Sequence, residues 1–594
     1  MRWHPRHRAL AVLGLSWSIA APLAVAAPEY HPIMPTMEAK IVTITGHDLT
    51  IEDVVAVARY GAKVRYSPEA IQHASDGRGL RQEAGAEGMP VYGLNRGGGA
   101  LREVVTHDEE TRRISEMKHG AREGVLPEIA DEELVRAFLV IRANSVPYEA
   151  APPEFMQMIV DLLNKRVTPL MYSRGTLGEG DLFLTSNFLA TMAGGGDAYY
   201  QGVRMNAADA LTKAGLKPLS TEPGGGTSNA YADAQAALLV ADAKTALEWT
   251  DIIHALDKLG MNSSLTPTST PVQAKRPFKW VAWDAARLMD LLRGSYLFED
   301  DPKRILQDPE SMRASYIRQG SAWQAWASLR DNVLVQINSG EQNPAFIVGA
   351  SPSDSWELST PQFMKYYVKG GPASHGQHGY VFSNANWDPY PMANEIEAFT
   401  NALANMDAAV AQRIERFSDR GPTAFFTGVK IADVLSPQQI EASPSMLEPY
   451  FAFMDVWEEI QSLSHSLTPE GNAADIGVAD VEAQTRLKGW RGRQVVDLTM
   501  QLLAYDLLTS TYWMDVRKVE TPGRGFGQVP TAVWTAFRKV VPFQQDIDSR
   551  PNLPFGVVAY DFLKSTSPET FYPAGPAMPA TEGQWLEARP GAKK

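Results

Sequence analysis

Two segments of the sequence favour α-helices well beyond the usual length. One covers residues 229–259, is rich in alanine and stops at Gly260, and the other covers residues 393–417. Helices in globular proteins average about 10–14 residues, and longer ones need a large apolar partner surface. That need is typical of a bundle whose spine is shared between subunits. The sequence therefore predicts an all-α fold built on a long-helix bundle, and we expect a homotetramer.

The N-terminal part of the chain predicts shorter helices. Thr50 and Asp53 form a capping pattern before a helix over residues 51–60. Ser67-Pro68 is typical of the cap and first turn of a second helix. Helical periodicity is also clear in two later stretches, residues 131–143 and 154–163. These helices predict a small region in front of the bundle.

Two features make this N-terminal region mixed rather than purely helical. Residues 40–45 give the clearest short strand, because clear β alternation is scarce elsewhere. Between Gly79 and Gly99 the chain is glycine-rich and aperiodic, which indicates a loop over a functional site.

The first residues predict export from the cytoplasm. Arginines precede a short apolar run over residues 9–21, and Ala24-Val25-Ala26 fits a signal-peptide cleavage site. The alternative is an uncleaved membrane anchor. No other segment is a candidate for a membrane span. We expect a periplasmic or secreted protein without a membrane span after cleavage.

Composition excludes several classes of activity. The 594 residues carry a net charge of -14, which argues against nucleic acid or an anionic membrane as the main partner. The chain has no cysteine, so it has neither disulfides nor a thiolate nucleophile. We divide it into a signal peptide (1–26), an N-terminal region with active-site loops (27–225), a central bundle (226–520) and a C-terminal segment (521–594).

Two glycine-rich motifs carry side chains suited to proton transfer. Tyr92 lies within a glycine-rich loop over residues 91–99, and its phenol can act as a base only if its pKa is lowered. Glu179 lies between Gly178 and Gly180, where a carboxylate can face a cavity. The alternatives without a catalytic role are a surface turn for the first motif and a tight helix start capped by Asp181 for the second.

A third motif suits the binding of a carboxylate. Glu310 and Arg313 are one helical turn apart, so they can form a salt bridge, or Arg313 can bind a substrate carboxylate. His375 and His378 could bind a metal, but neither a cysteine nor a clear carboxylate partner accompanies them. We therefore expect no metal site.

Taken in order, these segments resemble the aromatic amino acid lyase family, which includes the histidine, phenylalanine and tyrosine ammonia-lyases and related aminomutases. The matching blocks extend over roughly residues 40–520 and comprise Leu49 to Val54 with Ser67 to Glu69, Tyr92 to Asn95, Val140 to Asn144, Leu163 to Pro169, Gln307 to Arg313, and Asn338 to Pro344. The resemblance implies an all-α, homotetrameric protein whose active sites are each built from several subunits.

Within the resemblance, several positions match residues of the family's active site. Tyr92 matches the catalytic loop tyrosine, Arg313 matches the arginine that holds the substrate carboxylate, and Gln307 matches a glutamine of the substrate site. Asn229, in Gly226-Thr227-Ser228-Asn229, is similar to the family's Asn-Gly-Thr segment, with its register open. We therefore assign Arg313, Gln307 and Asn229 to substrate binding.

The departures from the family pattern concern its prosthetic group. Family members cyclise Ala-Ser-Gly into methylidene-imidazolone, an electrophile that needs the serine. This chain has Gly178-Glu179-Gly180 there, in a stretch one residue shorter, and Glu310 replaces the family's usual tyrosine. Since glutamate cannot dehydrate to the methylidene group, we expect no methylidene-imidazolone and no other cofactor.

These residues favour a lyase that acts on a small carboxylate substrate by β-elimination without that electrophile. Arg313 would hold the carboxylate, Tyr92 would move a proton, and Glu179 or Glu310 would serve as the second acid or base. We expect these residues to converge on one cavity, to which Tyr92 can come from the same or a neighbouring subunit. One alternative is a non-catalytic binding protein on a retired lyase fold, and another is an ordinary ammonia-lyase with an unrecognised electrophile.

Overall fold

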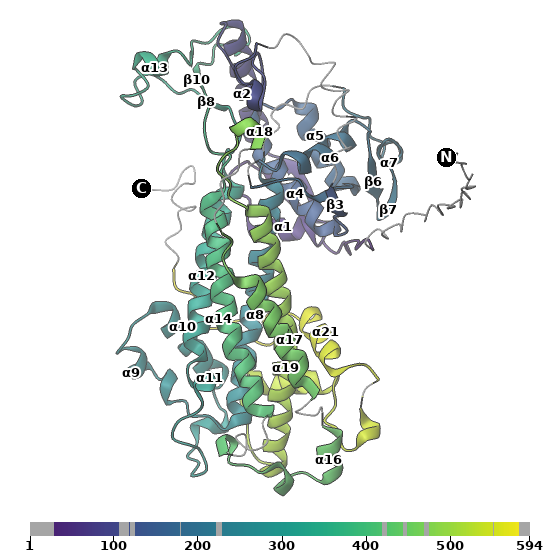
Figure 1. Cartoon of the computed structure of the whole chain (residues 1–594), viewed down its shortest axis with the longest axis vertical. Helices are drawn as coiled ribbons and strands as arrows, with labels where there is room; N and C mark the ends of the chain where they lie inside the picture. The colour runs from purple at the N-terminus through teal and green to yellow at the C-terminus, as the bar shows by residue number, and fades with distance from the viewer. Residues whose placement is uncertain are drawn as a thin grey trace, which may run out of the picture.

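The computed structural model in Figure 1 is an elongated, mostly helical molecule with a helical bundle at one end and a smaller mixed region at the other. It describes residues 29–105, 118, 125–178, 180–220, 228–418, 425–443, 448–468, 474–550 and 552–580. The predicted signal peptide and its cleavage site lie outside these residues. The predicted fold class, a long-helix bundle with a small mixed N-terminal region, is confirmed.

Four long helices form the spine of the bundle: α8 (Ala230–Met261), α12 (Ser315–Ile337), α14 (Tyr390–Ser418) and α19 (Thr485–Glu520). Around them pack α10 (Lys279–Leu291), α17 (Glu448–Ser464), α20 (Gln528–Arg538) and α21 (Phe555–Ser565). Their apolar side chains belong to one continuous core that extends into the N-terminal region. The sequence did not single out α19, although it is the longest of the described helices.

Helix α8 passes through the residue that we expected to stop it. Gly260 lies inside the helix, which ends instead at Asn262 in the left-handed conformation with φ +61°. A β-carbon at position 260 would lie 2.9 Å from Cβ of Trp513 on α19. Gly260 therefore lets α19 pack closely against α8, and the predicted stop at this position is wrong.

The N-terminal region begins with the two capped helices that the sequence predicted. Thr50 caps α1 (Ile51–Ala58) and Ser67 caps α2 (Pro68–Ala86), each by accepting a hydrogen bond from a backbone N–H of the first turn. Helix α2 continues past Gly79, where we expected a loop to begin. A β-carbon at Gly79 would lie 3.1 Å from the backbone of residues 373 and 374, so this glycine serves close packing within a helix.

The remaining elements of this region are short. Helices α4 (Glu132–Ser145) and α5 (Pro153–Lys165) match the predicted periodic stretches, and α6 (Leu182–Met192) and α7 (Ala207–Lys213) follow. Strand β1 (Ile41–Ile44) pairs in parallel with β2 (Lys63–Tyr66). Antiparallel pairing joins β3 (Val125–Glu128) to β5 (Tyr172–Arg174), and β4 (Val167–Pro169) to β6 (Asp197–Tyr200) and β7 (Val203–Asn206).

A fourth small sheet, formed by residues far along the chain, packs on α2. Its strands are β8 (Ala345–Val348), β10 (Gly379–Phe382) and β9 (Tyr367–Val368), in that order. The shortest described α-helices have four to six residues: α9 (Thr270–Gln273), α11 (Glu310–Arg313), α13 (Pro361–Met364), α16 (Pro437–Ala442) and α18 (Ala474–Gly477).

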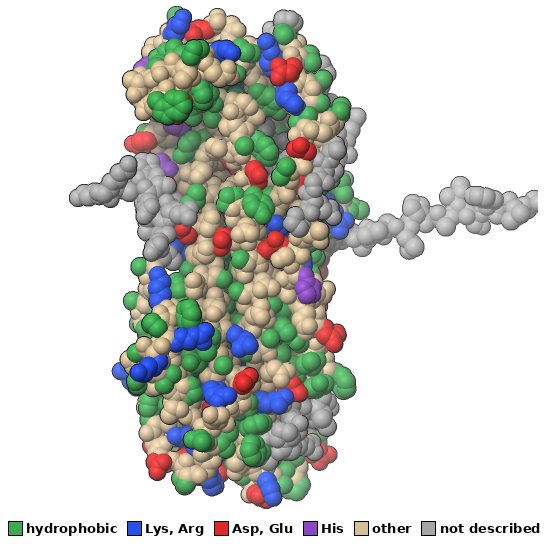
Figure 2. All heavy atoms as spheres, turned by 60° about the vertical axis from the view of Figure 1, so that its left-hand side comes forward, with side chains coloured by type: hydrophobic (Ala, Val, Ile, Leu, Met, Phe, Trp, Pro, Cys, Tyr) green, Lys and Arg blue, Asp and Glu red, His purple; other side chains and the backbone are tan. Residues whose placement is uncertain are grey.

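One face of the molecule carries charges of both signs. Lysine, arginine and acidic side chains all lie on the face that Figure 2 shows. None of the helices in the described part of the chain is long and apolar enough to cross a membrane.

Candidate active site

The glycine loop, residues 175–178 and Gly180, lies against the start of α19. Gly178 has φ +107° and Gly180 has φ +66°, a region of backbone space that favours glycine. The backbone N–H of Gln484 donates to the carbonyl of Leu177 at 2.9 Å. A β-carbon at Gly178 would lie 2.5 Å from the Gln484 nitrogen. Position 178 therefore excludes a side chain. Glu179 itself lies outside the described residues.

Asn229 fixes this loop to the N-terminal end of α8. Its Oδ1 accepts a hydrogen bond from the Gly180 N–H at 2.8 Å, and its Nδ2 donates to Oε2 of Glu341 at 2.9 Å and to the Trp387 carbonyl at 2.8 Å. The side chain is fully buried, and both amide protons are used within the protein. Within a single subunit, Asn229 therefore positions the glycine loop. Its predicted role in substrate binding stays a prediction.

Glu341 is the centre of this network, and the sequence did not point to it. Its Oε1 accepts hydrogen bonds from the Ser228 hydroxyl and the Asn229 N–H, both at 2.9 Å. Burial raises the pKa of Glu341 to about 7, although these hydrogen bonds favour the ionised carboxylate. The only signal in the sequence was an acidic residue inside the Asn338 to Pro344 block that resembles the family.

Two further carboxyl groups are buried beside this network. Oδ2 of Asp181 accepts a hydrogen bond from the Ala232 N–H at 3.0 Å, and burial raises the Asp181 pKa to about 6. Burial raises the pKa of Asp233 well above its usual range, and the negative charges of Glu341 and Asp181 raise it further. The three groups therefore do not all ionise together at neutral pH. Such a separation of pKa values is a property of acid and base sites.

Tyr92 lies at the same end of the molecule, on the loop that follows α2. Its hydroxyl accepts a hydrogen bond from the Gly99 N–H at 3.1 Å. Asn95 closes the loop, accepting from the Val91 N–H and donating to the Met89 carbonyl, both at 2.8 Å. The Ala100 N–H donates to Asp475 of α18, just before α19. Residues Gly99–Leu101, which follow the loop, contact α18, and Figure 1 shows α2 and α18 at the same end of the molecule.

The carboxylate-binding motif lies at the opposite end of the bundle. The Met312 carbonyl of α11 contacts Nε2 of His254 on α8 at 3.2 Å. His254 is 25 residues beyond Asn229, or about 37 Å along a helix that rises about 1.5 Å per residue. Gln307 and Glu310 are exposed, and Arg313 is half-buried. One chain therefore does not bring Arg313 to the glycine loop, because the rigid helix α8 separates them.

The predicted contact between Glu310 and Arg313 does not form either. Among the ion pairs of the described residues, none joins these two side chains, although both belong to the single turn of α11. Arg313 instead lies close enough to Asp308 to lower the pKa of that carboxyl, against a larger rise caused by burial. Convergence of the predicted residues on one cavity needs a second subunit and stays a prediction.

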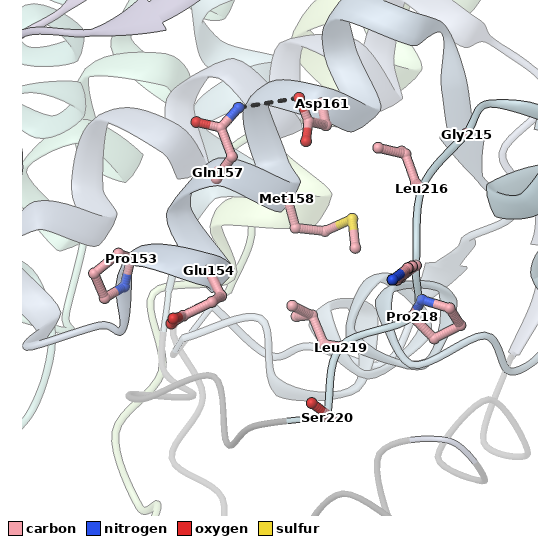
Figure 3. A pocket seen from close by; sticks show the side chains of 11 residues that line it. Pro153, Glu154, Gln157, Met158, Asp161, Gly215, Leu216, Pro218, Leu219 and Ser220 are labelled. Carbon is pink, nitrogen blue, oxygen red and sulfur yellow. Dashed lines mark hydrogen bonds between the residues drawn. The ribbon is translucent and has the colours of Figure 1, made fainter.

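The cavity in Figure 3 lies away from these groups. It has a volume of about 500 Å³ and lies between α5 and the segment over residues 215–220, with Gln157 hydrogen-bonded to Asp161 on its wall. Its lining includes none of the site residues that the sequence predicted. In the part of the chain that the structure describes, no three histidine or acidic side chains are placed to share a metal ion.

The candidate site thus consists of long packed helices, a glycine loop fixed to the start of one of them, and buried carboxyl groups beside that loop. The sequence model of the family described as aromatic amino acid lyase matches residues 49–539. The chain belongs to this family.

Individual relatives agree with this assignment. Histidine ammonia-lyase of Treponema denticola is 27% identical over 522 residues, which cover 85% of this chain and 94% of that protein. Histidine ammonia-lyase 2 of Fusobacterium nucleatum is 30% identical over 317 residues, but these span 52% of this chain and only 62% of the relative.

Solved structures share the fold. Ergothionase from Treponema denticola, described as an ergothioneine-degrading enzyme, matches with a TM-score of 0.75 at 24% identity, covering 89% of this chain and 99% of that one. Tyrosine aminomutase from Streptomyces globisporus matches with a TM-score of 0.72 at 20% identity, covering 88% of this chain and 97% of that one.

The residues at the glycine loop do not fit methylidene-imidazolone, the group that the family resemblance implies. Residues 178–180 are Gly-Glu-Gly, so no serine hydroxyl is present to be lost as water. In the resemblance Gly178 matches the family's alanine, and the backbone at Gly178 leaves no room for a β-carbon.

Proposed function

We propose that this protein is a lyase that acts by β-elimination on a small carboxylate substrate without methylidene-imidazolone. The observation that carries the proposal is the glycine loop. Asn229 and Glu341 fix this loop at the start of α8, and its Gly178-Glu179-Gly180 sequence offers neither a serine nor space for a side chain at position 178, which supports a reaction without the family's electrophile.

The missing electrophile restricts the substrate. In the elimination, a base removes a proton from the carbon β to the nitrogen, a carbon–carbon double bond forms, and the carbon–nitrogen bond breaks with its electron pair leaving on nitrogen. A quaternary ammonium group leaves as a neutral tertiary amine and needs no capture by an electrophile. We infer that the substrate is an α-trialkylammonium carboxylate. The ergothioneine-degrading relative supports this choice and makes ergothioneine the first compound to test.

The active site would combine groups from at least two subunits of a homotetramer. Tyr92 would move a proton at the loop end, and Arg313 of the partner subunit would bind the substrate carboxylate through its planar guanidinium. Glu179, or Glu310 of the partner subunit, would serve as the second acid or base. Glu341 would act as a positioning residue, because it holds Asn229 and through it the Gly180 backbone.

Intact mass and product analysis of the purified protein test this proposal. We expect the mass of the processed chain without the loss of two waters, about 36 Da, that the prosthetic group requires. We also expect an unsaturated acid and a tertiary amine from ergothioneine or the trimethylated betaine of an aromatic amino acid, and no turnover of histidine, phenylalanine or tyrosine. A mass lower by about 36 Da together with ammonia release from those amino acids would refute the proposal.

We propose in addition that the protein is exported and cleaved near Ala26, as the first residues of the sequence suggest. N-terminal sequencing of the protein from the periplasmic or secreted fraction tests this. Cytosolic protein with its first residues intact would contradict export.

A further inference from the structure

A polar cavity lies between the N-terminal region and the bundle, distinct from the candidate active site. Its volume is about 960 Å³, within the usual range for small-molecule sites. The end of α1, the start of α4, and parts of α8, α19 and α21 with the segment that follows it form its walls. The cavity is therefore lined by the N-terminal region, the central bundle and the C-terminal segment.

One wall of this cavity carries more negative than positive charge. Arg59 is paired with both Glu133, at 2.7 Å, and Asp242, at 2.6 Å. Two carboxylates thus share one guanidinium, and burial raises the pKa of Glu133. An ammonium group bound between Glu133 and Asp242 would balance the second carboxylate, which is a favourable arrangement in a partly buried site.

Another wall presents a cation with free hydrogen-bonding capacity. Arg493 of α19 lies 3.8 Å from Asp131, its partner in an ion pair, and it donates no hydrogen bond to any residue that the structure describes. Its side chain is 21% exposed. An arginine guanidinium has five N–H donors in a planar fork that matches a carboxylate. This wall therefore suits a ligand carboxylate.

The remaining charged side chains on the walls, Asp497 and Lys564, already neutralise each other. Asp497 accepts hydrogen bonds from the Tyr560 hydroxyl at 2.5 Å and from Lys564 at 3.3 Å. The lining as a whole bears the cations Arg59, Arg493 and Lys564 and the carboxylates Asp131, Glu133, Asp242 and Asp497. That balance disfavours polyanions such as nucleotides.

We propose that this cavity binds a small zwitterion, a molecule with one carboxylate and one ammonium group. Arg493 binds the carboxylate, and Glu133 and Asp242 bind the ammonium group. Because Arg493 is on α19 and Glu133 is on α4, the ligand connects the bundle to the N-terminal region. Arg493 lies about two helical turns beyond the start of α19, where Gln484 contacts the glycine loop, so binding also stabilises the packing beneath the candidate active site.

Calorimetric titration of the full-length purified protein tests the proposal without any assumption about catalysis. The probes are the zwitterions glycine, 4-aminobutyrate and 6-aminohexanoate, with hexanoate and hexylamine as single-charge analogues. We expect at least one zwitterion to bind at least 10-fold more tightly than either analogue. No zwitterion binding at 10 mM, or equal binding of hexanoate or hexylamine, would overturn the proposal.

Substitutions locate the binding. Arg493→Gln and Asp242→Asn should each weaken zwitterion binding at least 10-fold. Arg491→Gln is the matched control, because Arg491 lies on the same helix, donates to the His465 carbonyl and does not line the cavity. Melting curves show whether each variant is folded. Unchanged zwitterion affinity in a folded Arg493→Gln or Asp242→Asn variant would overturn the proposal.

Discussion

Glu341 joins the start of α8 to the glycine loop through Asn229, across 112 positions of sequence. Its ionised carboxylate offers acceptors to the Ser228 hydroxyl and to two N–H groups of Asn229. Protonation places a hydrogen among these donors and weakens the network. Since burial raises the Glu341 pKa to about 7, the geometry of the loop should improve as pH rises through that value.

This network predicts a pH-dependent effect of Glu341→Gln on catalysis. Once a substrate is known, the kcat of the wild-type protein should rise as pH passes about 7. The variant should lose about 10- to 100-fold in kcat and lack this rise, because its amide N–H₂ faces donors and does not titrate. Kinetics from pH 5.5 to 8.5 provide the measurement. A variant with wild-type kcat and the same pH profile would contradict the role of Glu341.

Asp407 gives a prediction for stability. It is buried in the bundle and accepts a hydrogen bond from the Thr499 hydroxyl at 2.8 Å, and burial raises its pKa to about 8. In the unfolded chain an aspartate ionises near pH 3.9. The folded protein therefore retains a proton that the unfolded chain releases. The stabilising contribution of Asp407 is complete below about pH 4 and is lost as pH rises to about 8.

Asp407→Asn cannot ionise and should escape this loss. Between pH 5 and 8, its free energy of unfolding should rise relative to that of the wild type by about 2 kcal/mol or more. Urea unfolding at several pH values measures the difference. Asp455→Asn, at an exposed position, is the control and should follow the wild type. Parallel stability curves for Asp407→Asn and the wild type would show that the proton is not retained.

The sequence predicted a single residue of the site only where that residue belonged to a recognisable local motif. Glycines marked the loop at Gly178 and Gly180, and the structure places both in left-handed backbone conformations. Glu341 and Asp233 gave no such local signal, because their partners are distant in sequence. The separation of Arg313 from the loop was likewise invisible, since it depends on the length and direction of α8.

At the scale of elements, glycines of α19 set the distance between the central helices. A β-carbon at Gly492 would lie 2.9 Å from Cδ2 of Leu239 on α8 and 3.1 Å from the Thr400 hydroxyl on α14. Gly492→Val should therefore lower the free energy of unfolding by about 1–3 kcal/mol through overpacking. Gly523→Ala, which meets nothing within 4 Å, is the control and should change it by less than about 0.5 kcal/mol.

Thermal and urea unfolding of both variants measure this effect. If Gly492→Val unfolds at the same temperature and urea concentration as the wild type, the helices can separate at this point without loss of stability.

The sequence predicted a helix correctly where its cap residues and its apolar periodicity indicated the same segment. The cap residues Thr50 and Ser67 marked α1 and α2, and the alanine-rich segment marked α8. Helix α19 lacks a clear apolar face, because its first half mixes arginines and glycines with apolar residues and its second half is buried on most sides. Glycines within α2 and α8 were misleading, since they serve contacts with other elements rather than helix ends.

At the scale of the whole molecule, the separation of Arg313 from the glycine loop predicts complementation between subunits. Tyr92→Phe and Arg313→Gln should each be inactive alone. A site formed by Tyr92 of one chain and Arg313 of another is intact in about a quarter of sites when equal amounts mix at random. Co-expression of the two variants should therefore restore about a quarter of the wild-type activity.

Activity per milligram of the co-expressed variants is the measurement, and light scattering should give the mass of a tetramer. Two copies of the same variant, expressed together, are the control and should remain inactive. Activity that stays at the level of the single variants, or the mass of one subunit at low micromolar concentration, would rule out a shared site.

The pairing of α8 with α19 also has a consequence for biosynthesis. The two helices lie side by side, yet 223 residues separate the end of α8 at Met261 from the start of α19 at Thr485. A ribosome that adds about 5–20 residues per second needs roughly 10–45 s to cover that distance. During this time the newly made α8 exposes apolar surface that only the later helix covers. The nascent chain therefore carries this uncovered apolar surface throughout the synthesis of those residues.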